Sequence, residues 1–263
     1  MHPAGPGARP SGPGQPDPVV LVAHGSRDAR AAEATRALAR AVSAARPGTA
    51  VLASWLDHTE PGPAAVLRDL ARAGQPRAVL VPLLLTAAYH RRVDIPAAVA
   101  AAGEAGPPIA VRVTEVLGPA DGEVDTGLLA GLRRRLDEAG ADRFDGLVLA
   151  AAGTRDARAR GSVGRVAAAL RDDLGVPTHV SYASAASPDV GAAVARLRAG
   201  GARRVAVSAY FLAPGLFHDA VSKAARGAGA VVSAPLADAP ELADLVLRRV
   251  DAVSRSVGSP ARP

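Results

Sequence analysis

Apolar and polar residues follow one another along this chain in blocks that predict strands and helices in turn. Short apolar runs, typical of strands buried on both faces, occupy residues 18–25, 50–58, 77–87 and 109–118. Segments with apolar residues at helical spacing lie between them, at 28–48, 61–74 and 95–106. Strands that alternate with helices of this length indicate right-handed βαβ units. The pattern therefore predicts an α/β fold, with a mostly parallel sheet flanked by helices.

The same order of elements recurs in the second part of the chain. The stretch "LVAHGSRDAR" at 21–30 is matched by "LAAAGTRDAR" at 149–158, an offset of 128. Residues 58–85 are matched by 185–212 at an offset of 127. Repetition at this scale indicates a duplicated structural unit. We therefore expect two homologous α/β domains in one chain.

Composition along the chain suggests where these domains begin and end. We expect a disordered tail at 1–17, which is rich in Pro and Gly, a first domain at 18–117 and a second at 144–253. The linker 118–143 contains the predicted helix "DTGLLAGLRRRLDEAG", and 254–263 form a second disordered tail. Because one chain carries both copies, the duplication favours a monomer with an internal pseudo-dimer.

Ligand-capable side chains follow three predicted strands of the first half. They are His24 after the first strand, Asp57 and His58 after the second, and His90 shortly after the third. The carboxyl ends of parallel strands meet at one edge of a sheet, where ligands bind. Imidazole and carboxylate groups suit a divalent first-row metal. A single histidine at a strand end more often bonds a backbone carbonyl, but two at neighbouring strand ends favour a metal site.

The second half serves as an internal control, because it repeats the turns without these side chains. The aligned pairs are His24 with Ala152, Asp57 with Ser184, and His90 with Phe217. If the fold itself needed the histidines, the duplicate would need them too. We therefore assign His24 and His90 to function, with Asp57 as a further candidate.

Basic side chains lie beside these candidates. Arg27, Arg91 and Arg92 are neighbours of the two histidines, and His218 aligns with Arg91. Guanidinium groups bind carboxylates through two parallel hydrogen bonds, so these residues are candidates for binding an anionic substrate. The alternative interpretation is that they are solvated surface charges, and for His218 that it stands at a helix start.

Composition narrows the chemistry further. The chain has no cysteine, which excludes disulfides, thiolate metal sites and thiol nucleophiles. Its formal charge of +6 suits a small anion at least as well as nucleic acid, since only one Trp, three Tyr and three Phe are present to stack on bases. No apolar run is long enough to span a bilayer, and 1–17 lack the apolar core of a signal peptide. We expect a cytoplasmic protein that binds neither nucleic acid nor membranes.

Two motifs together resemble a known family. "LVAHGSRD" and "VPLLLTAAYHRRVDIP", with "AYFLAPGLFHD" in the second half, are similar to the sirohydrochlorin chelatases, the class II enzymes that insert cobalt or ferrous iron into sirohydrochlorin. The resemblance spans both halves and corresponds to the long, two-domain members. It implies a lyase of sirohaem or cobalamin biosynthesis, with two chelatase-like domains.

The resemblance also implies roles for individual residues. His24 and His90 would hold the incoming Fe²⁺ or Co²⁺, which is a substrate, so no cofactor is permanently bound. Asp57 stands where relatives often have a glutamate, which leaves its role as third ligand or base open. Two alternatives remain at this point: a metal or tetrapyrrole carrier without turnover, and a ferrochelatase that acts on another tetrapyrrole.

Overall fold

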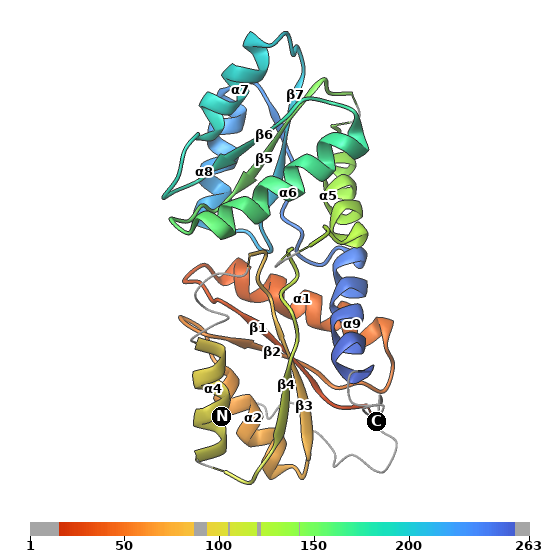
Figure 1. Cartoon of the computed structure of the whole chain (residues 1–263). Helices are drawn as coiled ribbons and strands as arrows, with labels where there is room; N and C mark the ends of the chain where they lie inside the picture. The colour runs from red at the N-terminus through yellow and green to blue at the C-terminus, as the bar shows by residue number, and fades with distance from the viewer. Residues whose placement is uncertain (1–15, 87–93, 105, 120–121, 142, 256–263) are drawn as a thin grey trace.

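A computed structural model describes residues 16–86, 94–104, 106–119, 122–141 and 143–255 (Figure 1). Within these residues the chain forms two sheets of four parallel strands each, one in each half. The strand order is β2-β1-β3-β4 in the first sheet and β6-β5-β7-β8 in the second, so both sheets have the same topology. The predicted α/β class with two homologous domains is confirmed.

The first half contains the predicted elements in the predicted order. They are β1 (Val19–Ala23), α1 (Ala29–Ala45), β2 (Val51–Trp55), α2 (Pro63–Arg72), β3 (Arg77–Pro82), α4 (Asp94–Glu104) and β4 (Ala110–Val113). The second half repeats them as β5 (Gly146–Ala151), α6 (Ala157–Leu174), β6 (Thr178–Tyr182), α7 (Val190–Ala199), β7 (Val205–Tyr210), α8 (Leu216–Gly227) and β8 (Val231–Val232). Two further helices follow the two sheets, α5 (Thr126–Glu138) and α9 (Pro240–Arg255).

The central strand β1 shows why its sequence is apolar throughout. Val19 and Leu21 belong to one buried cluster, whereas Val20 and Val22 belong to another on the opposite face of the sheet. Successive side chains of a strand point to opposite faces, so a sheet covered by helices on both sides requires a continuous apolar run. The fully buried run at β1 therefore places the following residue, His24, at the point where the chain leaves the core.

The helix α5 follows the first sheet but packs on the second half. The Arg133 guanidinium pairs with Asp173 of α6 at 3.2 Å. Arg135 donates a hydrogen bond to the carbonyl oxygen of Leu236 at 3.0 Å and pairs with Asp238 at the same distance. The helix of the predicted linker thus packs on the second half.

The last helix, α9, makes the opposite crossing and lies beside α1 of the first half (Figure 1). Asp251 pairs with Arg46 at the end of α1 at 2.7 Å, and the Arg249 guanidinium donates a hydrogen bond to the carbonyl oxygen of Val116 at 3.0 Å. The predicted second domain, 144–253, includes most of this helix. Boundaries read from the repeat do not show which sheet a terminal helix covers, because its apolar face suits either one.

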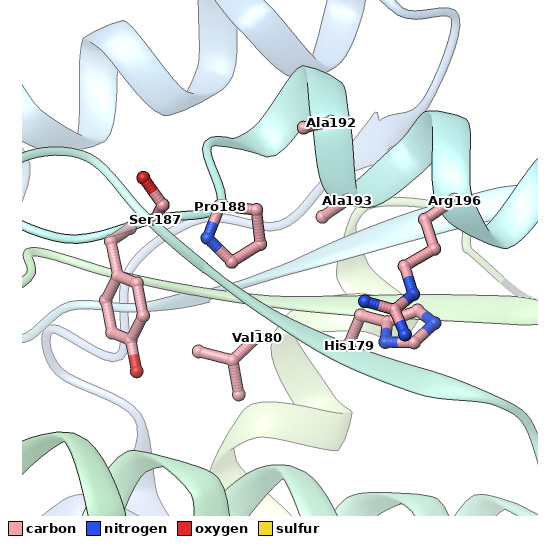
Figure 2. A pocket seen from close by; sticks show the side chains of 8 residues that line it. His179, Val180, Ser187, Pro188, Ala192, Ala193 and Arg196 are labelled. Atoms are coloured by element: carbon pink, nitrogen blue, oxygen red, sulfur yellow. The ribbon is translucent and has the colours of Figure 1, made fainter.

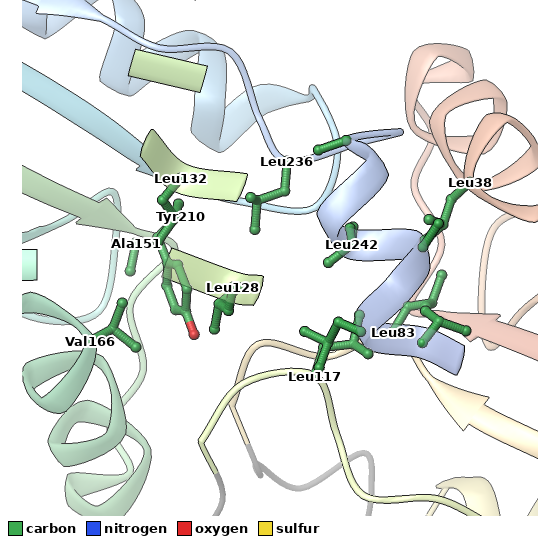
Figure 3. Close-up of a cluster of buried hydrophobic side chains, with 14 of the residues drawn as sticks. Leu38, Leu83, Leu117, Leu128, Leu132, Ala151, Val166, Tyr210, Leu236 and Leu242 are labelled. Atoms are coloured by element: carbon green, nitrogen blue, oxygen red, sulfur yellow. The ribbon is translucent and has the colours of Figure 1, made fainter. Parts of the chain in front are cut away.

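This exchange of helices joins the two halves through one hydrophobic cluster. Figure 3 shows Leu38, Leu83 and Leu117 of the first half gathered around α9, with Leu128 of α5 and Tyr210 of β7 nearby. All five side chains are nearly inaccessible to solvent. Burying a leucine stabilises a fold by about 1.5–3 kcal/mol, so the shared cluster strongly couples the halves.

The described structure includes the residues at the inner end of each predicted tail. Asp17 accepts a hydrogen bond from Arg77 at 3.0 Å and also pairs with Arg112. At the other end, α9 continues to Arg255, beyond the predicted boundary at 253. Residues 1–15 and 256–263 lie outside the described residues. In the part of the chain that the structure describes, no helix has the length and apolar character needed to cross a bilayer.

Candidate functional site

The turn after β1 carries His24 and depends on Gly25. Gly25 has a φ of +96°, a conformation that residues with a side chain rarely adopt. A Cβ atom there would lie only 1.8 Å from the carbonyl oxygen of Asp57. The backbone N–H of Asp57 in turn donates a hydrogen bond to the carbonyl oxygen of His24 at 3.0 Å. The structure thus brings His24 and Asp57 onto adjacent turns at the carboxyl edge of the first sheet.

The second half builds the same turn without the ligand-capable side chains. Gly153 has a φ of +95°, and a Cβ atom there would lie 1.9 Å from the carbonyl oxygen of Ser184. The backbone N–H of Ser184 donates to the carbonyl oxygen of Ala152 at 3.0 Å. The backbone geometry is therefore independent of His24 and Asp57.

The polar residues that follow each turn have the same structural role in both halves. The Ser26 hydroxyl accepts a hydrogen bond from the backbone N–H of Asp28 at 3.0 Å, and the Asp28 carboxylate accepts one from that of Arg30, so Asp28 caps α1. Thr154 and Asp156 repeat this arrangement at the start of α6. These side chains begin the helices in both halves, whereas His24 of the first turn is replaced by Ala152 in the second.

The Asp57 carboxylate is held by its neighbour, His58. The backbone N–H of His58 donates to one carboxylate oxygen at 2.8 Å, and its Nε2 lies 3.3 Å from the other. The Asp57 side chain is 59% exposed, so it is open to an incoming molecule. The sequence placed His58 at the correct strand end but did not reveal this contact, because the turn that folds the imidazole back depends on a φ of +60° at His58.

Three predicted site residues lie outside the described residues: His90, Arg91 and Arg92. The chain that leads to them is anchored by the second half, since the Tyr210 hydroxyl donates a hydrogen bond to the carbonyl oxygen of Leu85 at 3.0 Å. Burial raises the pKa of Tyr210, so its hydroxyl remains a donor. Among the described residues, no three His, Asp or Glu side chains gather closely enough to hold a metal ion. The pairing of His24 with His90 therefore stays a prediction.

An ion pair links the two halves beside the His24 turn. The Arg30 guanidinium contacts Asp28 at 2.5 Å and Asp219 of α8 at 2.6 Å. Hydrogen bonds from Arg30 lower the pKa of both carboxyl groups. The start of α8 is thereby held against the start of α1. Arg27 is exposed, and no carboxylate in the described part of the chain pairs with it.

Two large apolar side chains stand exposed at the start of α8. Leu216 is 85% exposed and Phe217 is 49% exposed. They lie three and two residues before Asp219, which pairs with Arg30 of the first half. Exposed apolar side chains that lie next to each other can form a surface for binding another molecule. The position that aligns with His90 is therefore an apolar surface in the second half.

The neighbouring His218 points into its own half. Its side chain is 14% exposed, its Nε2 lies 3.3 Å from the carbonyl oxygen of Ser233, and its ring packs edge-on against Phe211 at 6.0 Å between centroids. These contacts fit the alternative interpretation of a residue that supports the start of a helix. Its predicted role in substrate binding stays a prediction.

Comparison with known proteins places this arrangement in a family. The CbiX family model matches the chain twice, over residues 18–139 and 146–253. The chain belongs to the CbiX family. The resemblance to the sirohydrochlorin chelatases is thus confirmed, and the two matches correspond to the two halves. No curated protein sequence matches the chain.

Solved structures related to the CbiX family share the fold over nearly their whole length. SirB from Bacillus subtilis with Fe³⁺ has a TM-score of 0.79 at 20% identity, covering 92% of this chain and 98% of its own. The sirohydrochlorin chelatase SirB from Bacillus subtilis subspecies spizizenii in complex with cobalt has a TM-score of 0.75 at 19% identity, covering 91% and 96%. CbiX, described as the terminal enzyme for biosynthesis of siroheme in denitrifying bacteria, has a TM-score of 0.63 at 22% identity, covering 89% and 98%.

Proposed function

We propose that this CbiX-family protein is a chelatase, a lyase that inserts Fe²⁺ or Co²⁺ into sirohydrochlorin. The observation that carries the proposal is the repeated turn, which holds His24 and Asp57 in one half and Ala152 and Ser184 in the other. Family membership supports the reaction, and the two SirB structures, one with iron and one with cobalt, support both metals as candidates.

His24 and His90 are proposed to present the metal ion to the macrocycle. Neutral imidazoles are good ligands for divalent first-row metals, and two of them leave positions open for the ring nitrogens. His24 is exposed at the end of a rigid, buried strand, which fixes its position while leaving access for the ion. As the nitrogens of the macrocycle replace the imidazoles, the metal passes from the protein to the product.

The reaction also releases two protons, because two pyrrole N–H bonds break as the metal binds to the ring nitrogens. The Asp57 carboxylate, oriented by His58, is proposed to accept one of them. A carboxylate held by an imidazole can pass the proton on to solvent, since both groups are exposed. The released imidazoles or water accept the other proton. Because an imidazole binds a metal only in its neutral form, metal insertion should slow in acid.

The second half is proposed to contribute the surface on which the macrocycle lies. Leu216 and Phe217 offer an exposed apolar surface suited to a flat ring system. The exposed Arg27, together with Arg91 and Arg92, is proposed to bind the acetate and propionate groups at the rim of the macrocycle. Because one chain contains both sides, we infer that it acts as a monomer, which light scattering would test.

The direct experiment is a metal-insertion assay. Purified protein is mixed anaerobically with sirohydrochlorin and either Fe²⁺ or Co²⁺, and the absorption spectrum is followed. We expect faster insertion than in the reaction without protein for at least one metal, with many turnovers per chain. Comparing the two rates identifies the preferred metal and so distinguishes a route to sirohaem from one to cobalamin.

Two outcomes would contradict the proposal. Stoichiometric binding of metal or tetrapyrrole without turnover would indicate a carrier protein. Faster insertion into protoporphyrin than into sirohydrochlorin would indicate a ferrochelatase for another tetrapyrrole.

A further inference from the structure

A groove lies on the outer edge of the second sheet, between β6 and α7 (Figure 2). Its volume is about 620 Å³, in the range of pockets for small organic ligands. The residues that line it include His179, Val180, Tyr182, Ser187, Pro188 and Arg196. None of them belongs to the His24 turn or to the exposed surface at the start of α8.

The position of β6 at the edge of its sheet explains how His179 reaches this groove. His179 stands in register with Val148 of β5, whose side chain faces the cluster that contains Ala193 of α7. His179 therefore points to the α7 side of the sheet. Figure 2 shows its ring beside the Arg196 guanidinium, which extends from α7.

His179 and Arg196 can both donate hydrogen bonds to a ligand in the groove. Burial lowers the pKa of His179, and the charge of Arg196 lowers it further, so the imidazole is neutral near pH 7. The guanidinium remains charged, and no carboxylate among the described residues pairs with Arg196. A guanidinium beside a neutral imidazole offers several N–H donors and no negative charge.

The first half shows that the fold does not require this combination. At an offset of 127, His179 corresponds to Leu52 and Arg196 to Asp69. Leu52 packs against a buried cluster of the first half, and Asp69 pairs with Arg72 at 3.3 Å. The first half thus has an apolar residue at the place of His179 and an acidic residue at the place of Arg196.

We propose that this groove binds a small organic anion through a carboxylate or phosphate group. Arg196 would take the oxyanion in bidentate fashion, with His179 and the Ser187 hydroxyl as further donors. Pro188 and Ala192, which also line the groove, would contact the hydrocarbon part of the ligand. The proposal does not depend on the chelatase reaction, since the groove lies apart from the residues assigned to it.

The test uses the full-length protein and two matched probes, benzoate and phenyl phosphate, with inorganic phosphate as a third. Each is titrated at constant ionic strength while the imidazole resonances are followed by NMR, with His179 assigned by its loss in His179→Leu. That variant should fold, because Leu52 occupies the equivalent place in the first half. We expect one aromatic probe to bind saturably with a Kd of about 1 mM and to shift the His179 resonance.

Two arginine variants decide whether binding occurs in the groove. Arg196→Gln should weaken binding about tenfold, whereas Arg198→Gln, which removes the same charge from the same helix, should change it less than about twofold. Preference for benzoate or for phenyl phosphate identifies the oxyanion and supports the proposal in either case. No saturable shift of His179 with any probe, equal losses in the two variants, or binding of inorganic phosphate alone in all variants would overturn it. Metal insertion should be unchanged in Arg196→Gln, so the two proposals can fail separately.

Discussion

The two halves of this protein share a topology and a turn, yet they differ in the side chains at the same places. In the first half the turn carries His24 and Asp57, and in the second it carries Ala152 and Ser184. The glycine that permits the turn has the same positive φ in both. The comparison separates residues that build the fold from residues that are free to do chemistry.

Replacing His24 tests this separation most strongly. His24→Ala makes the first turn resemble the second, and we expect metal insertion to fall by about 100-fold or more because a metal ligand is lost. The unfolding free energy should hardly change, since the duplicate builds the turn with Ala152. The rate of insertion and urea unfolding measure the two effects.

The matched control for this variant is His179→Ala, which removes a histidine from the second half. Insertion should stay within about twofold of the original rate. A similar loss of activity in both variants would contradict the assignment of the metal site to the first half.

Substituting either turn glycine should destabilise the protein equally, but only the substitution in the first half should reduce activity. Gly25→Ala and Gly153→Ala each force a residue with a side chain to a positive φ and into a backbone carbonyl, so each should destabilise the protein by about 2–3 kcal/mol. At a temperature where both variants are folded, only Gly25→Ala should lose insertion activity. Urea unfolding and initial rates provide the measurements.

Substituting a third glycine shows how much of the lost stability comes from the positive φ and how much from the steric clash of the added Cβ atom. Gly48 also has a positive φ, of +86°, but nothing lies within 4 Å of an added Cβ atom. Gly48→Ala should therefore cost only about 1 kcal/mol. An equal cost at all three positions would show that the close approach of the two turns is not important.

Substituting Phe217, one of the two exposed apolar residues at the start of α8, tests whether the second half contributes to substrate binding. Phe217→Ala should raise the KM for sirohydrochlorin about tenfold, because a ring that the substrate would cover is lost, and should leave kcat largely unchanged. The melting temperature should not fall, since Phe217 is exposed. Val231→Ala, an exposed apolar residue on β8, is the control. Equal effects on KM would argue against a substrate surface at α8.

The smallest expected effect concerns the Arg30 ion pair between the halves. Arg30 holds the pKa of Asp28 and Asp219 below their ordinary value of 3.8. A lowered folded-state pKa stabilises the fold above pH 3.8, and this contribution is lost as pH falls through the lowered value. Arg30→Gln should therefore be slightly less stable than the original protein at pH 7. The difference in unfolding free energy between the two proteins should disappear in strong acid.

The control for this pair lies within a single helix. Arg40 pairs with Glu33 on α1 at 2.7 Å, so Arg40→Gln also removes an exposed ion pair. Of the two variants, only Arg30→Gln should also raise the KM for sirohydrochlorin, because Arg30 pairs with Asp219 of α8, whereas Arg40 pairs within α1. Urea unfolding at several pH values tests the stability difference, and substrate titrations test the change in KM.

Much of the fold was predictable because the hydrophobic pattern is local. The alternating strands and helices, the helix over 126–138 and the duplication all follow from spacing and repetition along the chain. The crossing of α9 to the first half was not predictable, since its leucines would cover either sheet equally well. The contact between Asp57 and His58 was also hidden, because it depends on a positive φ that no neighbouring residue type demands.

The candidate site was also predictable from the sequence only in part. Comparing the halves by sequence alone singled out His24, and the structure shows the adjacent turn that brings Asp57 beside it. The inward orientation of His218 could not be foreseen, because it depends on Ser233 and Phe211, which approach from other parts of the second half. The groove at His179 was missed for a similar reason, as Arg196 is distant in sequence.

The reciprocal crossing of α5 and α9 has a consequence for the ancestry of the chain. Two identical subunits that each lend a terminal helix to the other form a domain-swapped dimer, and joining them end to end yields this connectivity. Such a fusion frees the copies from symmetry, so that a mutation in one no longer appears in both. The protein can then keep its imidazole on one side and place an aromatic ring on the other, a division of labour that identical subunits cannot achieve.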